Sequence, residues 1–169
     1  MTQVKMESWN CLLLVLFALC VPGGLATCRK GWVTFEDTCY LFSHGKSSWG
    51  EAYSTCLALH SNLAVITSAE QQNFLISELT DKHRTDAWNV LYWIDGTDLE
   101  VENVWKWAIS GEKLSYINWA DGEPNNAQGG NCMNLYGNGG FKMADDDCEL
   151  HLYYICQATN VEGSGVVIG

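Results

Sequence analysis

Proline, positive charge and catalytic motifs are scarce in this chain of 169 residues. There are two prolines, Pro22 and Pro124, and 9 Lys and Arg residues stand against 20 Asp and Glu, for a formal net charge of −11. This negative charge argues against nucleic acid and anionic membranes as partners. G-x-S-x-G and H-E-x-x-H motifs are also missing. A hydrolase would lack its usual groups, and we do not expect an enzyme.

Long apolar segments are few as well. One segment runs from Cys11 to Val21 after Lys5, and the small residues Gly24 and Ala26 follow it. This is the pattern of a secretory signal peptide, and the segment is shorter than the about 20 apolar residues of a membrane span. We expect residues 1–26 to be a cleaved signal peptide and the protein to be secreted and extracellular, without a membrane span. A membrane anchor is the alternative.

Pairs of the form C-x-x-C do not occur, which weakens a zinc interpretation. Without residues 1–26 an even number of cysteines remains, and in an oxidising compartment this favours disulfides. Six cysteines allow many pairings, and the sequence alone does not choose among them. The six are Cys28, Cys39, Cys56, Cys132, Cys148 and Cys156.

The spacing of apolar residues predicts two helices. Between Ser47 and Leu59, apolar residues recur at helical intervals. A second helix is expected to begin at Ser68, because Ser68 and Gln71 fit the S-x-x-Q capping box. Its buried stripe would consist of Phe74, Leu75 and Leu79.

Strands are predicted where aromatic and β-branched residues gather. The expected strands are a hairpin within 28–43, a short run at 63–66, a central strand at 91–94 and final strands at 134–136 and 153–157. Residues 95–140 are mostly loop, rich in Gly, Asn, Asp and Ser, and loops of such length are uncommon unless they are functional. The tail at 158–169 has no clear structure.

The tripeptide Glu123-Pro124-Asn125 lies in this long loop. An acid and an amide separated by one rigid residue can project two side chains to the same side, and proline is the residue for which a cis peptide is cheap. Adjacent sugar hydroxyls need this pairing, since each can bind a hard cation, donate to a carboxylate and accept from an amide. An ordinary turn is the alternative. Asp145 begins a run of three carboxylates, which is either solvated or neutralised by a cation.

Several short motifs make residues 28–157 similar to the C-type lectin-like domain. They are Gly31-Trp32, Cys39-Tyr40, Leu63-Ala64-Val65-Ile66, Tyr92-Trp93-Ile94, Asn118-Trp119 and Tyr154-Ile155-Cys156. The resemblance implies an α+β fold in which two helices flank antiparallel sheets and a long loop region carries the ligands. It also implies the disulfide pairs Cys28–Cys39, Cys56–Cys156 and Cys132–Cys148.

The same resemblance implies a calcium (Ca²⁺) site of the mannose type, formed by Glu123, Asn125 and Asp145. Two further ligand positions of the family fall on Ala144 and Gly130, which offer no side-chain oxygen. An auxiliary calcium position maps to Asp98, Glu102, Asn126 and Asn131.

The function that follows is a secreted lectin that binds mannose-, fucose- or N-acetylglucosamine-type glycans and takes part in innate recognition of microbial surfaces. One such site binds weakly, so clustering, for example in a homo-oligomer, would be needed for avidity. The alternative is a calcium-independent module that binds a protein or another surface on the same scaffold, and the missing ligands at Ala144 and Gly130 are its support.

Overall fold

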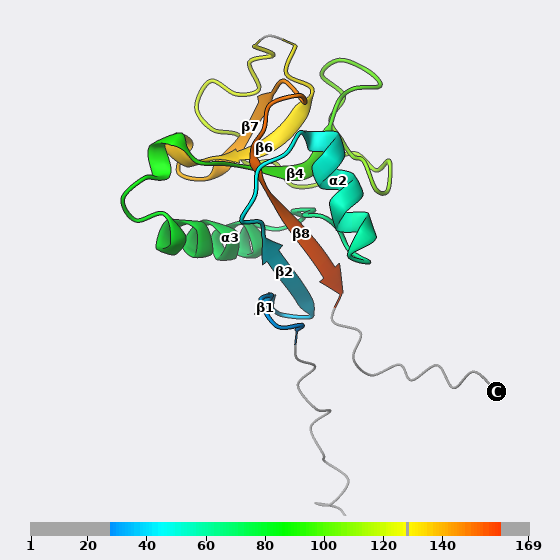
Figure 1. Ribbon diagram of the computed structural model, residues 1–169. Coiled ribbons are helices and arrows are strands. Elements are labelled where there is room, and N and C mark those ends of the chain that lie inside the picture. Colours follow the sequence, from blue (N-terminus) through cyan, green and yellow to red (C-terminus); the bar gives the residue numbers. More distant parts are fainter. Residues whose placement is uncertain (1–27, 128, 160–169) are drawn as a thin grey trace, which may run out of the picture. The chain divides into compact units, whose positions relative to one another are not determined.

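The computed structural model describes residues 28–127 and 129–159, all within one unit, Cys28–Asn160 (Figure 1). The predicted signal peptide, with Cys11 and Cys20, lies outside the described residues, as does the tail from residue 160 onward. In the described part no helix is long and apolar enough to cross a membrane.

The strands form one mixed sheet in the order β1-β2-β8-β4-β6-β7, with β3 attached to β8 and β5 to β4. Most pairs are antiparallel, but β4 and β8 pair in parallel through Tyr92↔Tyr153 and Trp93↔Tyr154. The predicted α+β class with two helices is therefore confirmed, with this one parallel pair in the sheet. The strands are β1 Val33–Phe35, β2 Thr38–Phe42, β3 Asn62–Leu63, β4 Leu91–Thr97, β5 Lys106–Trp107, β6 Cys132–Tyr136, β7 Lys142–Asp146 and β8 Tyr153–Thr159.

The two helices, α2 (Trp49–Ala58) and α3 (Ala69–Lys82), cover opposite faces of the central strands. Successive side chains of a strand point to opposite faces. On β4, Tyr92 and Ile94 pack in the core that contains α3, whereas Trp93 packs in the core that contains α2. Because both faces are buried, β4 reads as a continuous apolar run in the sequence.

The second helix begins at the predicted Ser68, and the first begins at Ser48, within the predicted range 47–59. Ser48 and Glu51 form a complete capping box at α2, which stabilises the helix by satisfying two backbone amides. At α3 the Ser68 hydroxyl accepts the Gln71 amide, but the Gln71 side chain accepts from Thr67 N at 2.9 Å instead of from Ser68. The predicted box at Ser68 is thus only half formed.

Several strands differ from the predictions, and β5 lies in the segment expected to be mostly loop. The run at 63–66 pairs as a strand only at Asn62–Leu63, although Ala64 N still donates to Ile155 O at 2.8 Å. Strand β8 extends to Thr159, two residues into the predicted tail. Strand β7 was not predicted, since its residues Lys-Met-Ala-Asp-Asp carry no β-branched or aromatic side chain.

All three implied disulfides are formed: Cys28–Cys39, Cys56–Cys156 and Cys132–Cys148. Cys56–Cys156 joins α2 to β8 across 100 residues of sequence. Cys132–Cys148 joins the start of β6 to the segment after β7. This last bridge fixes the end of the long loop beside the strand that carries Asp145.

Candidate functional site

The loop that carries Glu123 is anchored to β7. Ala120 N donates to Met143 O at 2.8 Å, and Glu123 N donates back to Ala120 O at 3.0 Å. The Glu123–Pro124 peptide bond is cis. The tripeptide is therefore placed directly beside the strand that holds Asp145.

The side chains of Glu123 and Asn125 lie on the same side of the loop. Asn125 Nδ2 is 2.9 Å from Glu123 Oε1 and also 2.9 Å from Oε2. Asn125 Oδ1 accepts the amide of Ala127 at 2.7 Å. The acid and the amide thus form one polar surface, as the tripeptide predicts for a pair that reads adjacent hydroxyls.

Asp145 reaches this surface from β7. Its side chain is buried, and its two oxygens accept the backbone amides of Asn125 and Asn126, each at 2.7 Å. The structure therefore brings the three predicted residues together, although 20 residues of sequence separate Asn125 from Asp145.

The site carries negative charge without a basic partner. Burial, and then the nearby Asp145 carboxylate, raise the pKa of Glu123 to about 7, although its hydrogen bonds with Asn125 act in the opposite direction. The four ion pairs found in the described residues involve neither Glu123 nor Asp145. Two close carboxylates of this kind favour the binding of a cation.

The positions of Ala144 and Gly130 explain why the ligand set is incomplete. A Cβ atom at Gly130 would lie 2.7 Å from Asp145 Oδ2 and 3.1 Å from Asp146 N, so a side chain there would have to displace the Asp145 carboxylate from its present position. Ala144 is buried and pairs with Asn134. Asp146, the next acidic residue, accepts from Asn134 Nδ2 at 2.9 Å, and burial raises its pKa. Asn134 was not predicted, because nothing in the sequence links it to Asp146.

Two of the auxiliary residues are paired with each other. Asn126 Nδ2 donates to Glu102 Oε1 at 3.0 Å. Asp98 is buried, with Oδ2 accepting Asn103 N at 2.8 Å and Oδ1 without a hydrogen-bond partner among the described residues. The Asn131 side chain instead donates to Gly129 O at 3.0 Å. Asp98, Glu102 and Asn126 thus have side-chain oxygens near the loop. Asn131 takes part through its backbone oxygen, which accepts Asp98 N.

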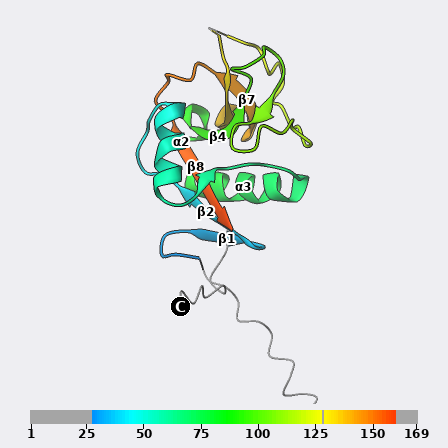
Figure 2. The same cartoon turned by 90° about the vertical axis from the view of Figure 1, so that its right-hand side faces the viewer.

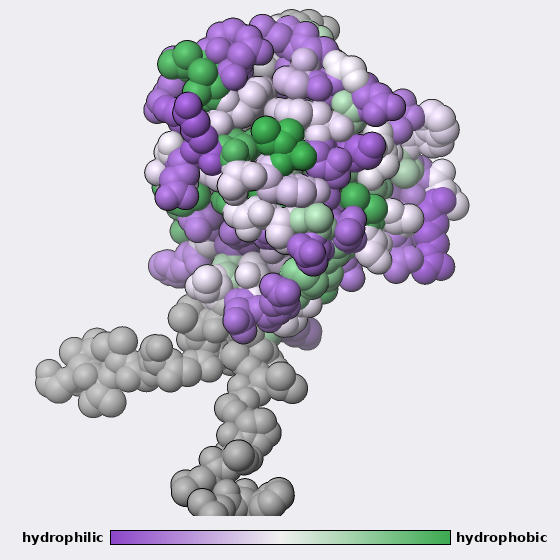
Figure 3. All heavy atoms as spheres, turned by 180° about the vertical axis from the view of Figure 1, so that it is seen from behind, coloured by the Kyte–Doolittle hydropathy of each residue, from purple (hydrophilic) through white to green (hydrophobic). Residues whose placement is uncertain are grey.

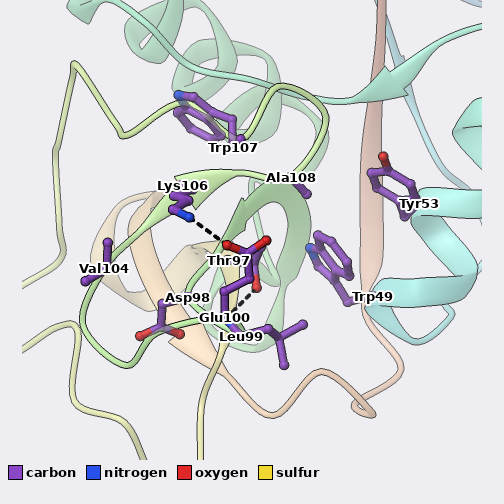
Figure 4. Close-up of a pocket in the computed structure, with 11 residues that line it drawn as sticks. Trp49, Tyr53, Thr97, Asp98, Leu99, Glu100, Val104, Lys106, Trp107 and Ala108 are labelled. Carbon is purple, nitrogen blue, oxygen red and sulfur yellow. Dashed lines mark hydrogen bonds and ion pairs between the residues drawn. The ribbon is translucent and has the colours of Figure 1, made fainter.

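A pocket of about 290 Å³ lies beside this auxiliary region, between α2 and the segment after β4 (Figure 4). Lys106 Nζ pairs with Glu100 across it, while the Asp98 carboxylate points away from Trp49 and Tyr53 (Figure 4). Lys106 therefore pairs with Glu100 and not with Glu102. This leaves Glu102 to pair with Asn126.

No group of three His, Cys, Asp or Glu side chains that could hold a metal ion occurs in 28–127 and 129–159. The site at Glu123 does not fall in such a group because one of its three members is the amide of Asn125. Amide and carboxylate oxygens together are suitable donors for Ca²⁺, which takes about six to eight oxygens. The residues present fit calcium, with fewer protein donors than a complete site would have.

The profile described as lectin C-type domain matches residues 45–158. C-type lectin domain family 4 member M of Gorilla gorilla gorilla is 33% identical over 137 residues, which cover 79% of this chain and only 34% of that protein. A perlucin-like protein of Mytilus galloprovincialis is 29% identical over 159 residues, 90% of this chain and 99% of that protein. The structure of the cow C-type carbohydrate-recognition domain of CD23, in the presence of GlcNAc2Man3 oligosaccharide, is 35% identical with a TM-score of 0.67, covering 79% of this chain and 96% of that one.

Proposed function

The chain belongs to the C-type lectin domain family, and we propose that it is a secreted, calcium-dependent lectin for mannose-, fucose- or N-acetylglucosamine-type glycans that recognises microbial surfaces. Members of this family are non-enzymatic carbohydrate-binding proteins. The observation that carries the proposal is the convergence of Glu123, Asn125 and Asp145 on one surface that has negative charge and no basic partner.

In this proposal Glu123, Asn125 and Asp145 hold the ion, and each also has a task of its own. Calcium, when bound, supplies coordination positions for two neighbouring sugar hydroxyls. The Glu123 carboxylate accepts a hydrogen bond from one hydroxyl, and the Asn125 side-chain N–H donates one to the other. Asp145 holds the loop in place through the amides of Asn125 and Asn126.

A single shallow site of this kind binds at about millimolar Kd, or about −4 kcal/mol. Useful avidity then requires clustering of several sites. On the face shown in Figure 3, hydrophobic residues form small separate patches within a hydrophilic surface. A homo-oligomer that used this face would be held by polar contacts and not by a broad apolar interface.

Retention on sugar beads tests the proposal. The refolded, oxidised protein is expected to bind mannose beads in millimolar calcium, to elute with chelator, and to pass through galactose beads. Equal passage through both resins, with calcium present and the fold intact by circular dichroism, would refute the calcium-dependent function.

Exchanging the acid and the amide should change the sugar preference. In the variant with Glu123→Gln and Asn125→Asp, the hydrogen-bond donor and acceptor trade places while the loop keeps its proline. We expect retention to move from mannose to galactose beads and to stay sensitive to chelator. A variant that keeps the original preference would show that this loop does not select the sugar.

A calcium-independent binding module is the second candidate, and one observation favours it. Both Asp145 oxygens already accept loop amides, so the loop has an anchor that uses only protein groups. In this case chelator would leave both the fold and the binding of a protein or surface partner unchanged.

A further inference from the structure

A pocket of about 240 Å³ lies far from the Glu123 loop. Its wall comes from the β1–β2 hairpin, the start of α3 and β8. In Figures 1 and 2 β1 and β2 lie at the opposite end of the unit from the long loop before β6. None of the predicted calcium ligands lines this pocket. Its polar lining residues include Glu36, Thr38, Tyr40, Ser68, Gln71 and Gln157.

The pocket wall is fixed by hydrogen bonds among its own residues. Gln71 Nε2 donates to Tyr40 Oη and to Val65 O, both at 2.6 Å. Gln157 Oε1 accepts Val65 N at 3.0 Å. Gln71 has thus left the usual capping-box bond at Ser68 to bridge β2 and the segment before α3. A wall arranged in this way needs little reordering when a ligand binds.

Other polar groups of the wall remain available. The Gln157 amide nitrogen and the Glu36 carboxylate make no hydrogen bond or ion pair within the part of the chain that the structure describes. Glu36 is exposed and Gln157 is partly exposed, so both can meet a ligand from solvent. Gln157 on β8 thus offers a hydrogen-bond donor, and Glu36, in the turn between β1 and β2, offers an acceptor.

The charge of the wall disfavours an anionic ligand. Burial, and to a lesser degree the Glu36 carboxylate, raise the pKa of Tyr40, so the phenol stays neutral and keeps its proton. The Glu36 carboxylate repels anions and has no cationic partner in the pocket. Phe35, which stacks on Phe74 at 4.6 Å between ring centroids, adds an aromatic ring to the lining.

The size of the pocket limits the ligand to a small molecule. Pockets for drug-sized ligands measure about 300–1,000 Å³, so the present 240 Å³ suits a single ring. The amide, hydroxyl and carboxylate groups of this lining match a ring that carries many hydroxyls. We propose that this pocket is a second carbohydrate-binding site, which takes one neutral sugar ring through hydrogen bonds and needs no metal ion.

This second site would give one chain two sugar-binding ends. The long loop before β6 and the β1–β2 hairpin, which lines the pocket, lie at opposite ends of the unit, so one chain could bridge two glycans (Figure 1). The second site does not depend on calcium, and its existence is separate from the function proposed above.

Amide NMR in the presence of chelator tests the site. The oxidised protein would be titrated to tens of millimolar with methyl α-mannoside, methyl β-galactoside and N-acetylglucosamine in turn. At least one sugar should shift the Gln157 side-chain amide and the backbone amides of Thr38 and Tyr40, while the amides of Asn125 and Asn126 stay unchanged. Absence of such shifts with all three sugars, in the folded protein, overturns the proposal.

A double variant, Glu36→Gly with Thr38→Val, separates binding from folding. Glu36 has a φ of 51°, which glycine adopts easily, and valine keeps the shape and strand propensity of Thr38. We expect this variant to bind the sugar at least about tenfold more weakly and to keep calcium-dependent retention on mannose beads. The control is Asp37→Asn, in the same turn but outside the pocket lining. Unchanged sugar shifts in the double variant would also overturn the proposal.

Discussion

Replacing Asp145 with Asn should weaken calcium-dependent retention on mannose beads by about a hundredfold or more. Asp145 is buried and holds the amides of Asn125 and Asn126 with its two oxygens. An Asn side chain has one oxygen, so its NH2 group would face a backbone N–H without an acceptor. The change also removes one of the two carboxylates expected to hold the ion.

Calorimetry with calcium alone separates loss of the ion from loss of the sugar contact. The Asp145→Asn variant should show much weaker calcium binding, while circular dichroism in chelator shows the same fold as the parent chain. Asp121→Asn is the matched control, because Asp121 is an exposed carboxylate two residues before Glu123. If Asp145→Asn and Asp121→Asn bind calcium equally well, Asp145 is not a ligand and the mapping of the site is wrong.

Local patterns in the sequence were enough to predict the helices and most of the sheet. Ser68 caps the second helix as predicted, because capping depends on residues only three apart, and Ser48 and Glu51 form the same pattern at the first helix. Strand β7 has no such local signal. Its Met143 and Ala144 are buried only because β6 pairs with them on one side and the segment at Trp119 on the other.

The sequence predicted which residues form the site but not the contacts among them. Glu123 and Asn125 are neighbours in the chain, so their pairing follows from the tripeptide. The crowding of Gly130 against Asp145 depends on how the loop end meets β7, and no short motif encodes that contact. In the sequence, Ala144 and Gly130 appear only as missing ligands, whereas the structure shows that a side chain at Gly130 would crowd the Asp145 carboxylate.

Asp95, in the buried interior of β4, was not predicted to have a role. Its side chain is buried, Oδ2 accepts Ile109 N at 2.9 Å, and Oδ1 has no partner among the described residues. Burial raises the pKa of Asp95 from 3.8 to about 7, and the amides of Ile109 and Ala108 oppose this only in part. The folded protein therefore keeps this proton over a pH range in which the unfolded chain has lost it.

The consequence is a loss of stability as pH rises. Below about pH 4 both states are protonated at Asp95, and the full stability is present. Between about pH 4 and about pH 7 the unfolded chain releases the proton first, which lowers the free energy of unfolding by an amount on the order of 4 kcal/mol. Above the folded pKa this contribution is fully lost.

Replacing Asp95 with Asn should remove this pH dependence and stabilise the protein by about 1–3 kcal/mol near pH 8, where the buried carboxylate is charged in the parent chain. The Asn oxygen can still accept Ile109 N, so the contact between β4 and the segment after β5 is kept. Urea unfolding in chelator near pH 5 and pH 8 measures the difference between variant and parent, and Asp121→Asn again serves as the exposed control. Because Glu123 and Asp146 also titrate at raised pKa in both proteins, only this difference reports on Asp95. If the variant is less stable than the parent by the same amount at both pH values, then Asp95 is ionised throughout this range and its second oxygen has a partner.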